Sequence, residues 1–189
     1  MSEYYDESLE ALRRAMESER VGYRFYLEAA ERSADPAGQG TFRSLAKDEE
    51  RHLALLLVEY NSLIAGEGWV DPEEAITREV EVDITKPLFP GEELVPQEKS
   101  PFEATWAAYD IEGLAGDLAV LEFGMDVEEE FYKMYENAAA ETDDPLGRRA
   151  YQFLMKWENR HYKLLQDAHD YLSDNKHWWD DWELPFFEG

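Results

Sequence analysis

The chain contains no cysteine among its 189 residues. This absence excludes disulfide bonds, a thiolate nucleophile, iron–sulfur clusters and the four-cysteine knuckles that hold iron or zinc. Any redox chemistry in this protein would therefore have to use oxygen and nitrogen atoms as ligands.

Basic residues are also scarce, since 18 Lys and Arg stand against 44 Asp and Glu and give a formal net charge of −26. A charge of this size repels polyanions, so we expect no nucleic acid and no membrane as a partner. Surplus acids are typical of a strongly solvated surface, but carboxylates gathered in one place would instead bind cations. The hydrophobic content of 44% predicts a folded core rather than disorder.

Long apolar runs are missing as well. The longest lies around residues 53–58 and is far too short to cross a bilayer, and residues 1–10 carry acids where a secretory signal needs a basic and then an apolar stretch. We therefore expect a cytoplasmic protein. Its length suits one domain, residues 1–189.

The first half of the chain shows helical periodicity. Apolar residues recur at three- and four-residue spacing from about 4 to 33 and again from about 41 to 64, which predicts a helical hairpin over residues 4–64. The residues expected to break the helix between these segments are Asp35, Pro36, Gly38 and Gly40.

The stretch from about 65 to 110 is rich in proline and is predicted to be a long extended crossover. The residues that favour one short strand within it are Val80, Val82 and Ile84. The residues that resemble a helix start, with an N-cap, a first-turn proline and a capping-box acid, are Ser100, Pro101 and Glu103.

A second helical hairpin is predicted over about residues 111–173, with a turn at residues 143–145. A tail follows from 174 to 189. Its large aromatic side chains, which we expect to pack on the bundle or on a second subunit, are Trp178, Trp179, Trp182, Phe186 and Phe187.

An internal repeat relates the two hairpins. A shift of 109 positions lays residues 124–165 on residues 15–56 without a gap, and 16 of the 42 positions are identical. Unrelated segments of ordinary composition would share roughly two or three. The polar identities include Glu19/Glu128, Tyr23/Tyr132, Tyr26/Tyr135, Lys47/Lys156, Glu49/Glu158, Arg51/Arg160 and His52/His161.

The repeated glutamates and histidines fall on apolar helix faces. Glu49 and His52 are three residues apart and share one face, as do Glu158 and His161. If the hairpins pack face to face, four carboxylates and two imidazoles meet inside the bundle, where unpaired anions are costly. Two divalent cations would balance the four carboxylates, and one Glu on each of two helices plus Glu-x-x-His on each of two others is the pattern of di-iron and di-manganese bundles.

These residues resemble the ferritin-like di-iron carboxylate proteins, and among them the rubrerythrins. The matching motifs are Met-Glu-Ser-Glu-Arg-Val-Gly-Tyr-Arg-Phe-Tyr at 16–26, Asp-Glu-Glu-Arg-His at 48–52 and Glu-Asn-Arg-His at 158–161. The resemblance implies an all-α fold: a ferritin-like antiparallel four-helix bundle, built here from a duplicated hairpin, with a long crossover between helices 2 and 3.

The resemblance also implies a set of metal ligands. The six expected ligands are Glu19, Glu49, His52, Glu128, Glu158 and His161. Among these, Glu49 and Glu158 would bridge two ions, the other two carboxylates would be terminal, and each imidazole would bind one ion. The tyrosines expected to donate hydrogen bonds to the carboxylates are Tyr23, Tyr26, Tyr132 and Tyr135. No catalytic residue separate from the ligands is expected.

The function implied by the resemblance is that of a non-haem di-iron oxidoreductase that reduces hydrogen peroxide or dioxygen, in the context of oxidative stress. Carboxylate-rich sites with one imidazole per ion suit two iron ions, with manganese as the other choice. Rubrerythrins carry a four-cysteine domain that this chain lacks, so an external electron donor is required. They also carry a further glutamate where this chain has Phe131, which bears on the choice between peroxide and dioxygen.

Two other functions remain open. A ferritin-like ferroxidase or iron store would assemble some two dozen chains into a shell, whereas we expect a homodimer for the enzyme. A metal-stabilised interaction module would instead hold a redox-inert ion such as zinc and use its aromatic tail as the contact surface.

Overall fold

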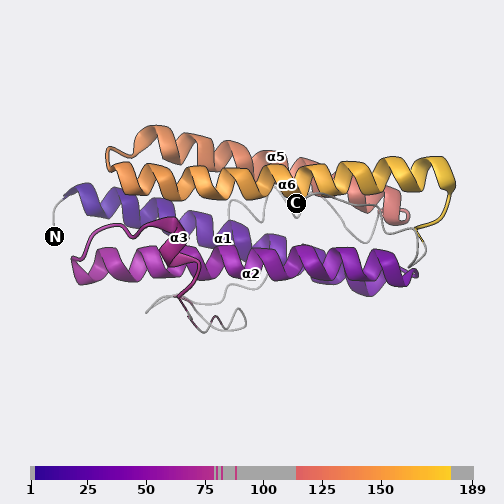
Figure 1. Cartoon of the computed structure of the whole chain (residues 1–189), viewed down its shortest axis with the longest axis horizontal. Helices are drawn as coiled ribbons and strands as arrows, with labels where there is room; N and C mark the ends of the chain where they lie inside the picture. Colours follow the sequence, from indigo (N-terminus) through magenta and orange to yellow (C-terminus); the bar gives the residue numbers. More distant parts are fainter. Residues whose placement is uncertain (1–2, 79, 81, 83–87, 89–113, 180–189) are drawn as a thin grey trace.

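The computed structural model describes residues 3–78, 80, 82, 88 and 114–179, with side chains from residue 7 onward. Four long helices lie side by side as an antiparallel bundle (Figure 1). These helices are α1 (Glu3–Arg32), α2 (Pro36–Ala65), α5 (Asp117–Glu141) and α6 (Pro145–Asn175). All regular secondary structure in the described ranges is helical, so the predicted ferritin-like helical bundle is confirmed. No described helix is long and apolar enough to span a membrane.

The helix α2 begins at Pro36, about five residues before the predicted start. The side chain of Asp35 accepts a hydrogen bond from the Ala37 N–H at 2.9 Å, and proline at the first helical position needs no hydrogen-bond partner of its own. The prediction that the glycines after it break the helix was wrong, because the cap and Pro36 start the helix ahead of them. The glycines that lie inside α2 are Gly38 and Gly40.

The second hairpin repeats this start, since Asp144 caps α6 through the N–H of Leu146 at 2.8 Å. The helix α5 begins at Asp117, later than the predicted residue 111, after Gly116 adopts the left-handed φ of 86° that suits glycine. The starts of α2 and α5 are therefore the boundaries that differ most from the prediction.

The crossover contains a short helix that was not predicted, α3 (Pro72–Ala75), capped by Asp71. Val80 and Val82 lie in irregular backbone. Several predictions concern residues outside the described ranges: the strand position Ile84, the helix start at Ser100, Pro101 and Glu103, and the tail residues Trp182, Phe186 and Phe187.

A tryptophan from each half of the chain covers the turn of the other half. A Cβ atom added to Gly38 would lie 2.8 Å from Cε2 of Trp178, and one added to Gly147 would lie 2.6 Å from Cε2 of Trp69. The two tryptophans are 109 residues apart, so the repeat extends beyond the segments that the sequence comparison aligned. The burial of Trp178 agrees with the prediction that the tail packs on the bundle.

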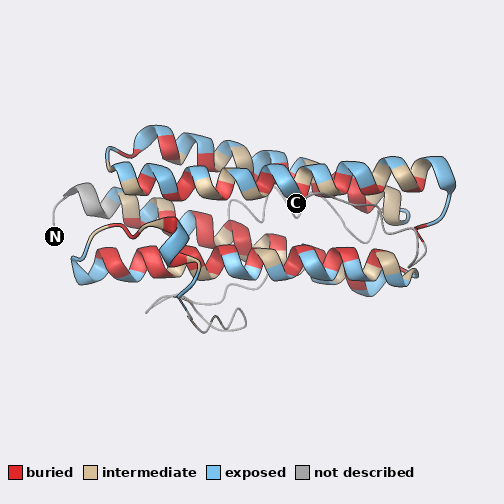
Figure 2. Ribbon diagram, in the orientation of Figure 1, coloured by how far each residue is buried: buried red, intermediate tan, exposed pale blue. Residues whose placement is uncertain are grey.

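Buried side chains line the inward faces of the four long helices (Figure 2). Most are apolar, as the periodicity predicted. Half of the buried polar residues are the predicted ligands, which lie near the middle of the four long helices. The fold thus brings a cluster of ionisable groups into an otherwise apolar interior.

Candidate metal centre

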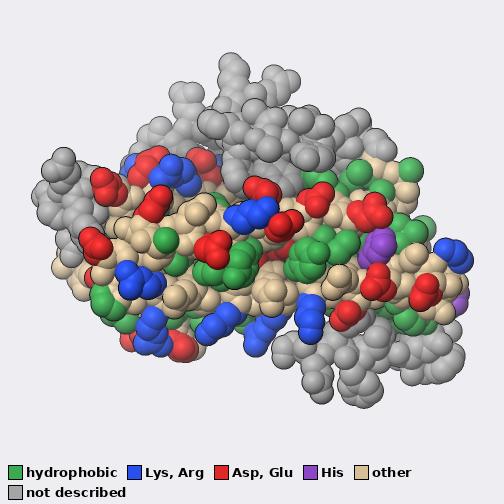
Figure 3. All heavy atoms as spheres, turned by 90° about the horizontal axis from the view of Figure 1, so that it is seen from above, with side chains coloured by type: hydrophobic (Ala, Val, Ile, Leu, Met, Phe, Trp, Pro, Cys, Tyr) green, Lys and Arg blue, Asp and Glu red, His purple; other side chains and the backbone are tan. Residues whose placement is uncertain are grey.

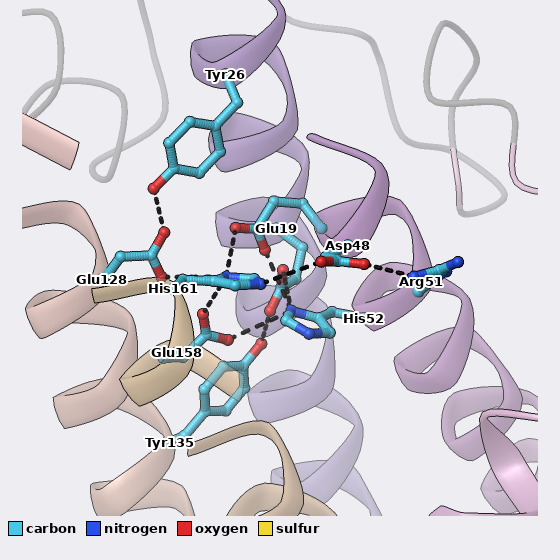
Figure 4. A network of polar contacts seen from close by, with 10 residues as sticks. Glu19, Tyr26, Asp48, Arg51, His52, Glu128, Tyr135, Glu158 and His161 are labelled. Atoms are coloured by element: carbon cyan, nitrogen blue, oxygen red, sulfur yellow. Dashed lines mark hydrogen bonds and ion pairs between the residues drawn. The ribbon is translucent and has the colours of Figure 1, made fainter. Parts of the chain in front are cut away.

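The structure brings all six predicted ligands together (Figure 4). Each of α1 and α5 contributes one glutamate, and each of α2 and α6 contributes a glutamate and a histidine one turn apart. None of the six residues is more than 3% exposed. Residues more than a hundred positions apart therefore form one buried polar cluster in the described part of the chain.

One group of donor atoms surrounds His52. Its Nδ1 lies 3.3 Å from Oε2 of Glu19, 3.2 Å from Oε2 of Glu49 and 3.4 Å from Oε1 of Glu158. Four ligands placed tetrahedrally about 2.0–2.2 Å from an ion lie about 3.3–3.6 Å from one another. The observed spacing is therefore that of a set of atoms around one metal ion.

A second group surrounds His161 in the same way. Its Nδ1 lies 3.4 Å from Oε1 of Glu49, 3.5 Å from Oε2 of Glu128 and 3.5 Å from Oε2 of Glu158. Glu49 and Glu158 each give one oxygen to this group and the other oxygen to the His52 group. Two carboxylates shared between two sites is the arrangement of a bridged two-metal centre.

Unpaired polar atoms mark the same place. Of the twelve buried side-chain nitrogen and oxygen atoms that lack a hydrogen bond in the described residues, eight belong to the six clustered side chains. A buried polar atom without a partner costs free energy, and metal coordination would satisfy six of the eight; the other two are the histidine Nε2 atoms, which lie outside the two donor groups. The donor set therefore fits two divalent cations.

Protons balance the charges of this cluster when no metal is bound. Burial, and then the charge of Glu49, raises the pKa of Glu19 to about 8. Burial, and then the charge of Glu19, raises the pKa of Glu158 well above its ordinary value. Burial lowers the pKa of each histidine, but the surrounding carboxylates outweigh it and raise both pKa values. Metal ions would have to displace these protons.

Glu49 behaves differently from its neighbours. Burial raises its pKa, but the positive charge of His161 and hydrogen bonds from both histidines outweigh burial and lower the pKa below its ordinary value. The carboxylate at the centre of the cluster is therefore ionised, with both oxygens available to cations.

Two of the four predicted tyrosines reach the cluster. Tyr26 donates a hydrogen bond to Oε1 of Glu128, and Tyr135 donates one to Oε1 of Glu19. In both carboxylates the other oxygen, Oε2, faces a histidine. Each tyrosine hydroxyl therefore orients the carboxylate that it binds. Tyr23 and Tyr132 are only partly buried, and no hydrogen bond among the described residues joins them to the cluster.

The sequence reasoning missed two residues next to the histidines. Oδ2 of Asp48 lies 3.7 Å from Nε2 of His161, too far for a hydrogen bond, and Arg51 holds the other oxygen of Asp48 at 2.6 Å. The repeat counterpart of Asp48 is Trp157, whose ring centroid lies 5.7 Å from that of His52 and 6.3 Å from that of His161. Both positions precede the histidine of their own helix by four residues, a spacing that could have identified them.

Phe131 occupies the position at which rubrerythrins carry a further glutamate. It is fully buried, and its repeat counterpart is Gly22. A Cβ atom on Gly22 would lie 3.0 Å from Cε2 of Phe131 and 3.5 Å from Cδ of Glu49. The phenyl ring therefore fills space against α1, beside the shared carboxylate.

Comparison with known proteins identifies one family. The sequence model of the rubrerythrin family matches residues 2–60 and 70–169. No curated protein and no solved structure gives a significant match.

Proposed function

Because the chain belongs to the rubrerythrin family, we propose that the buried cluster holds two iron ions and that the protein reduces hydrogen peroxide or dioxygen with electrons from an external donor. The observation that carries this proposal is the pair of four-residue donor groups that share Glu49 and Glu158. A pair of iron ions supplies two electrons to an oxygen substrate when each ion changes by one unit of charge.

The residues of the chain would hold this centre in a defined charge state. Four carboxylates neutralise two divalent ions, and one imidazole per ion adds no charge. The Tyr26 and Tyr135 hydroxyls orient the terminal carboxylates and occupy the oxygen that faces away from the histidine. The apolar ring of Phe131 excludes water from one side of Glu49.

Anaerobic titration with Fe²⁺ tests the metal site. We expect two ions per chain in the wild type, and loss of stoichiometric binding in Glu49→Ala and Glu158→Ala. Glu50→Ala is the matched control, because Glu50 is exposed on the same helix and next to Glu49. Two tightly bound ions in both ligand variants would refute the site. The same titration with Mn²⁺ compares the two candidate metals.

The reaction is tested by mixing the loaded protein with hydrogen peroxide or with air-saturated buffer while the near-ultraviolet absorbance is followed. A faster reaction with peroxide supports a peroxidase, and a faster reaction with air supports oxidase or ferroxidase chemistry. Absence of any reaction with either oxidant would contradict the proposed enzyme and favour a structural metal site.

Phe131 favours a second candidate, a ferritin-like ferroxidase that oxidises Fe²⁺ and stores it or passes it on. A phenyl ring cannot coordinate a metal ion that changes its ligand when its oxidation state changes, whereas the glutamate of rubrerythrins can. The mass in solution separates the two functions: a homodimer supports the enzyme, and an assembly of some two dozen chains supports a store.

A further inference from the structure

The charge of the chain is locally reversed on α6. Residues 145–166 contain a single acid, Glu158, which is buried in the metal cluster. The remaining residues hold the other 43 acids. The same 22 residues contain five basic side chains, which are Arg148, Arg149, Lys156, Arg160 and Lys163. This segment therefore carries a net positive charge in a chain whose net charge is −26.

Three of these residues form a stripe on the outer face of α6. Lys156, Arg160 and Lys163 follow one another at spacings of four and three residues, so they share one helix face, and all three are exposed. No acid among the described residues forms an ion pair with them. A row of Lys and Arg side chains runs along one edge of the molecule (Figure 3). We call these three residues the basic stripe.

The stripe lies over the histidines of the metal centre. The guanidinium of Arg160 sits 5.0 Å from the centroid of the Trp157 ring, and this ring makes edge contacts with the rings of His52 and His161. The two imidazoles are themselves stacked, with centroids 5.3 Å apart. Trp157 is only partly buried, so its side chain extends from the protein surface to the two histidines of the metal centre.

We propose that the basic stripe docks an acidic electron-carrier protein and that Trp157 is the route by which electrons pass from that carrier to the two histidines. The inference rests on the proposed function, which requires an external donor. The step is a one-electron transfer: the carrier is oxidised, the oxidised metal pair is reduced, and no bond forms or breaks. Two carriers docking in succession would return the pair to its reduced state.

Electrostatics favours a compact acidic protein on this surface. At about 0.1 M salt the screening length is about 10 Å, so a docked partner is influenced mainly by the charges it touches. The stripe from residue 156 to 163 is itself about 10 Å long. Charges placed in this way orient the partner and speed its association.

An extended polyanion such as nucleic acid fits less well. The same face of α6 continues with exposed acids about one, two and three turns beyond Lys163, so a long anionic strand would leave the stripe and meet negative charge. These acids are Asp167, Asp170 and Asp174. Electron tunnelling also becomes much slower as the distance between donor and acceptor grows. A compact carrier bound directly over Trp157 is therefore better placed to transfer an electron than one bound further away.

The docking surface is tested by binding, with or without metal. The probe is a plant-type [2Fe–2S] ferredoxin chosen for an excess of surface carboxylates, measured by titration calorimetry at about 0.1 M salt. We expect the double variant Lys156→Glu/Lys163→Glu to weaken binding at least about tenfold, and the difference to shrink as salt is raised. The matched control, Arg78→Glu/Lys133→Glu, reverses two exposed charges elsewhere and should change binding by less than about twofold.

Three binding results would overturn the docking surface: no salt-dependent binding of the ferredoxin, an equal loss in the control variant, or tighter binding of duplex DNA than of ferredoxin at the stripe. None of these depends on the metal. The docking surface can therefore fail while the proposed function stands.

The role of Trp157 is tested by the rate at which the oxidised, metal-loaded protein takes electrons from the bound ferredoxin, compared with hydroquinone, a small neutral reductant. In Trp157→Leu, compared with the wild type at equal metal content and with the ferredoxin fully bound, we expect the ferredoxin reaction to slow at least about tenfold more than the hydroquinone reaction. Trp157→Phe keeps an aromatic contact and should recover most of the rate. Equal slowing with both reductants would refute the route, and failure of both the ferredoxin and hydroquinone to reduce the wild type would instead refute the redox function.

Discussion

A buried glutamate outside the metal cluster gives a prediction about stability that can be worked out from the structure. Glu59 on α2 has no exposed surface. Its Oε2 accepts a hydrogen bond from the Val70 N–H at 2.8 Å, and its Oε1 has no hydrogen-bond partner among the residues that the structure describes. Burial raises its pKa from the ordinary 4.5 to about 7. A carboxyl group whose pKa is raised on folding stabilises the fold below its unfolded pKa, and this contribution is lost as the pH rises through the folded pKa.

The expected magnitude follows from that shift. Between 4.5 and about 7 the difference is about 2.5 pKa units, and each unit corresponds to about 1.4 kcal/mol, so the wild type loses about 3 kcal/mol of stability through Glu59 by pH 8. Glu59→Gln keeps the shape and an acceptor for Val70 but cannot ionise. We therefore expect the variant to match the wild type near pH 4 and to exceed it by about 3 kcal/mol near pH 8.5.

Urea unfolding of both proteins at a series of pH values, with the same metal content, measures this difference. Ionisation of the metal cluster is common to both chains and cancels in the comparison. Glu67→Gln serves as control, because Glu67 is exposed in the loop that follows the same helix. A variant whose stability relative to the wild type does not change with pH, or falls as the pH rises, would refute the reasoning.

Three further predictions concern the metal centre and the hairpin turns. Binding of two divalent ions near neutral pH should release up to four protons, one each from His52, His161, Glu19 and Glu158, because all four pKa values are raised. An indicator dye measures the release, and the metal affinity should decrease as the pH is lowered. Phe131→Glu should raise the ratio of the peroxide rate to the air rate, and an unchanged ratio at full metal content would show that this position does not set the substrate. Gly147→Ala should destabilise the fold by about 2 kcal/mol, because its Cβ would meet Trp69 at 2.6 Å, whereas Gly40→Ala has open space and should raise the melting temperature slightly.

Most of the metal centre was predictable because the duplication preserved it. The six ligands appear in both halves at the same spacing, and helix geometry places each Glu-x-x-His pair on one face. Two residues next to the histidines were not predictable in the same way, because Asp48 and Trp157 differ between the halves. The repeat marks the positions that both halves share and gives no signal where one half has acquired a different side chain.

The tyrosines show a second limit of the sequence. Tyr23 and Tyr26 both follow Glu19 on one face of α1, so they were assigned together. In the structure the hydroxyl that reaches a carboxylate crosses to the opposite hairpin, where Tyr26 meets Glu128, and this pairing depends on how far the two hairpins are offset along the bundle. Periodicity gives the face of a helix but not the partner across the core.

The crossed tryptophans have a consequence for how this chain could have arisen. Trp69 and Trp178 each seal the turn of the other half, as two identical hairpins would do for one another in a symmetric dimer, where each chain supplies what its mate lacks. Joining the two copies in one chain preserves these contacts and removes the requirement that both halves keep the same residue. The pairs Gly22/Phe131 and Asp48/Trp157 are positions where the halves differ, so the two donor groups, although related by the repeat, have unequal surroundings.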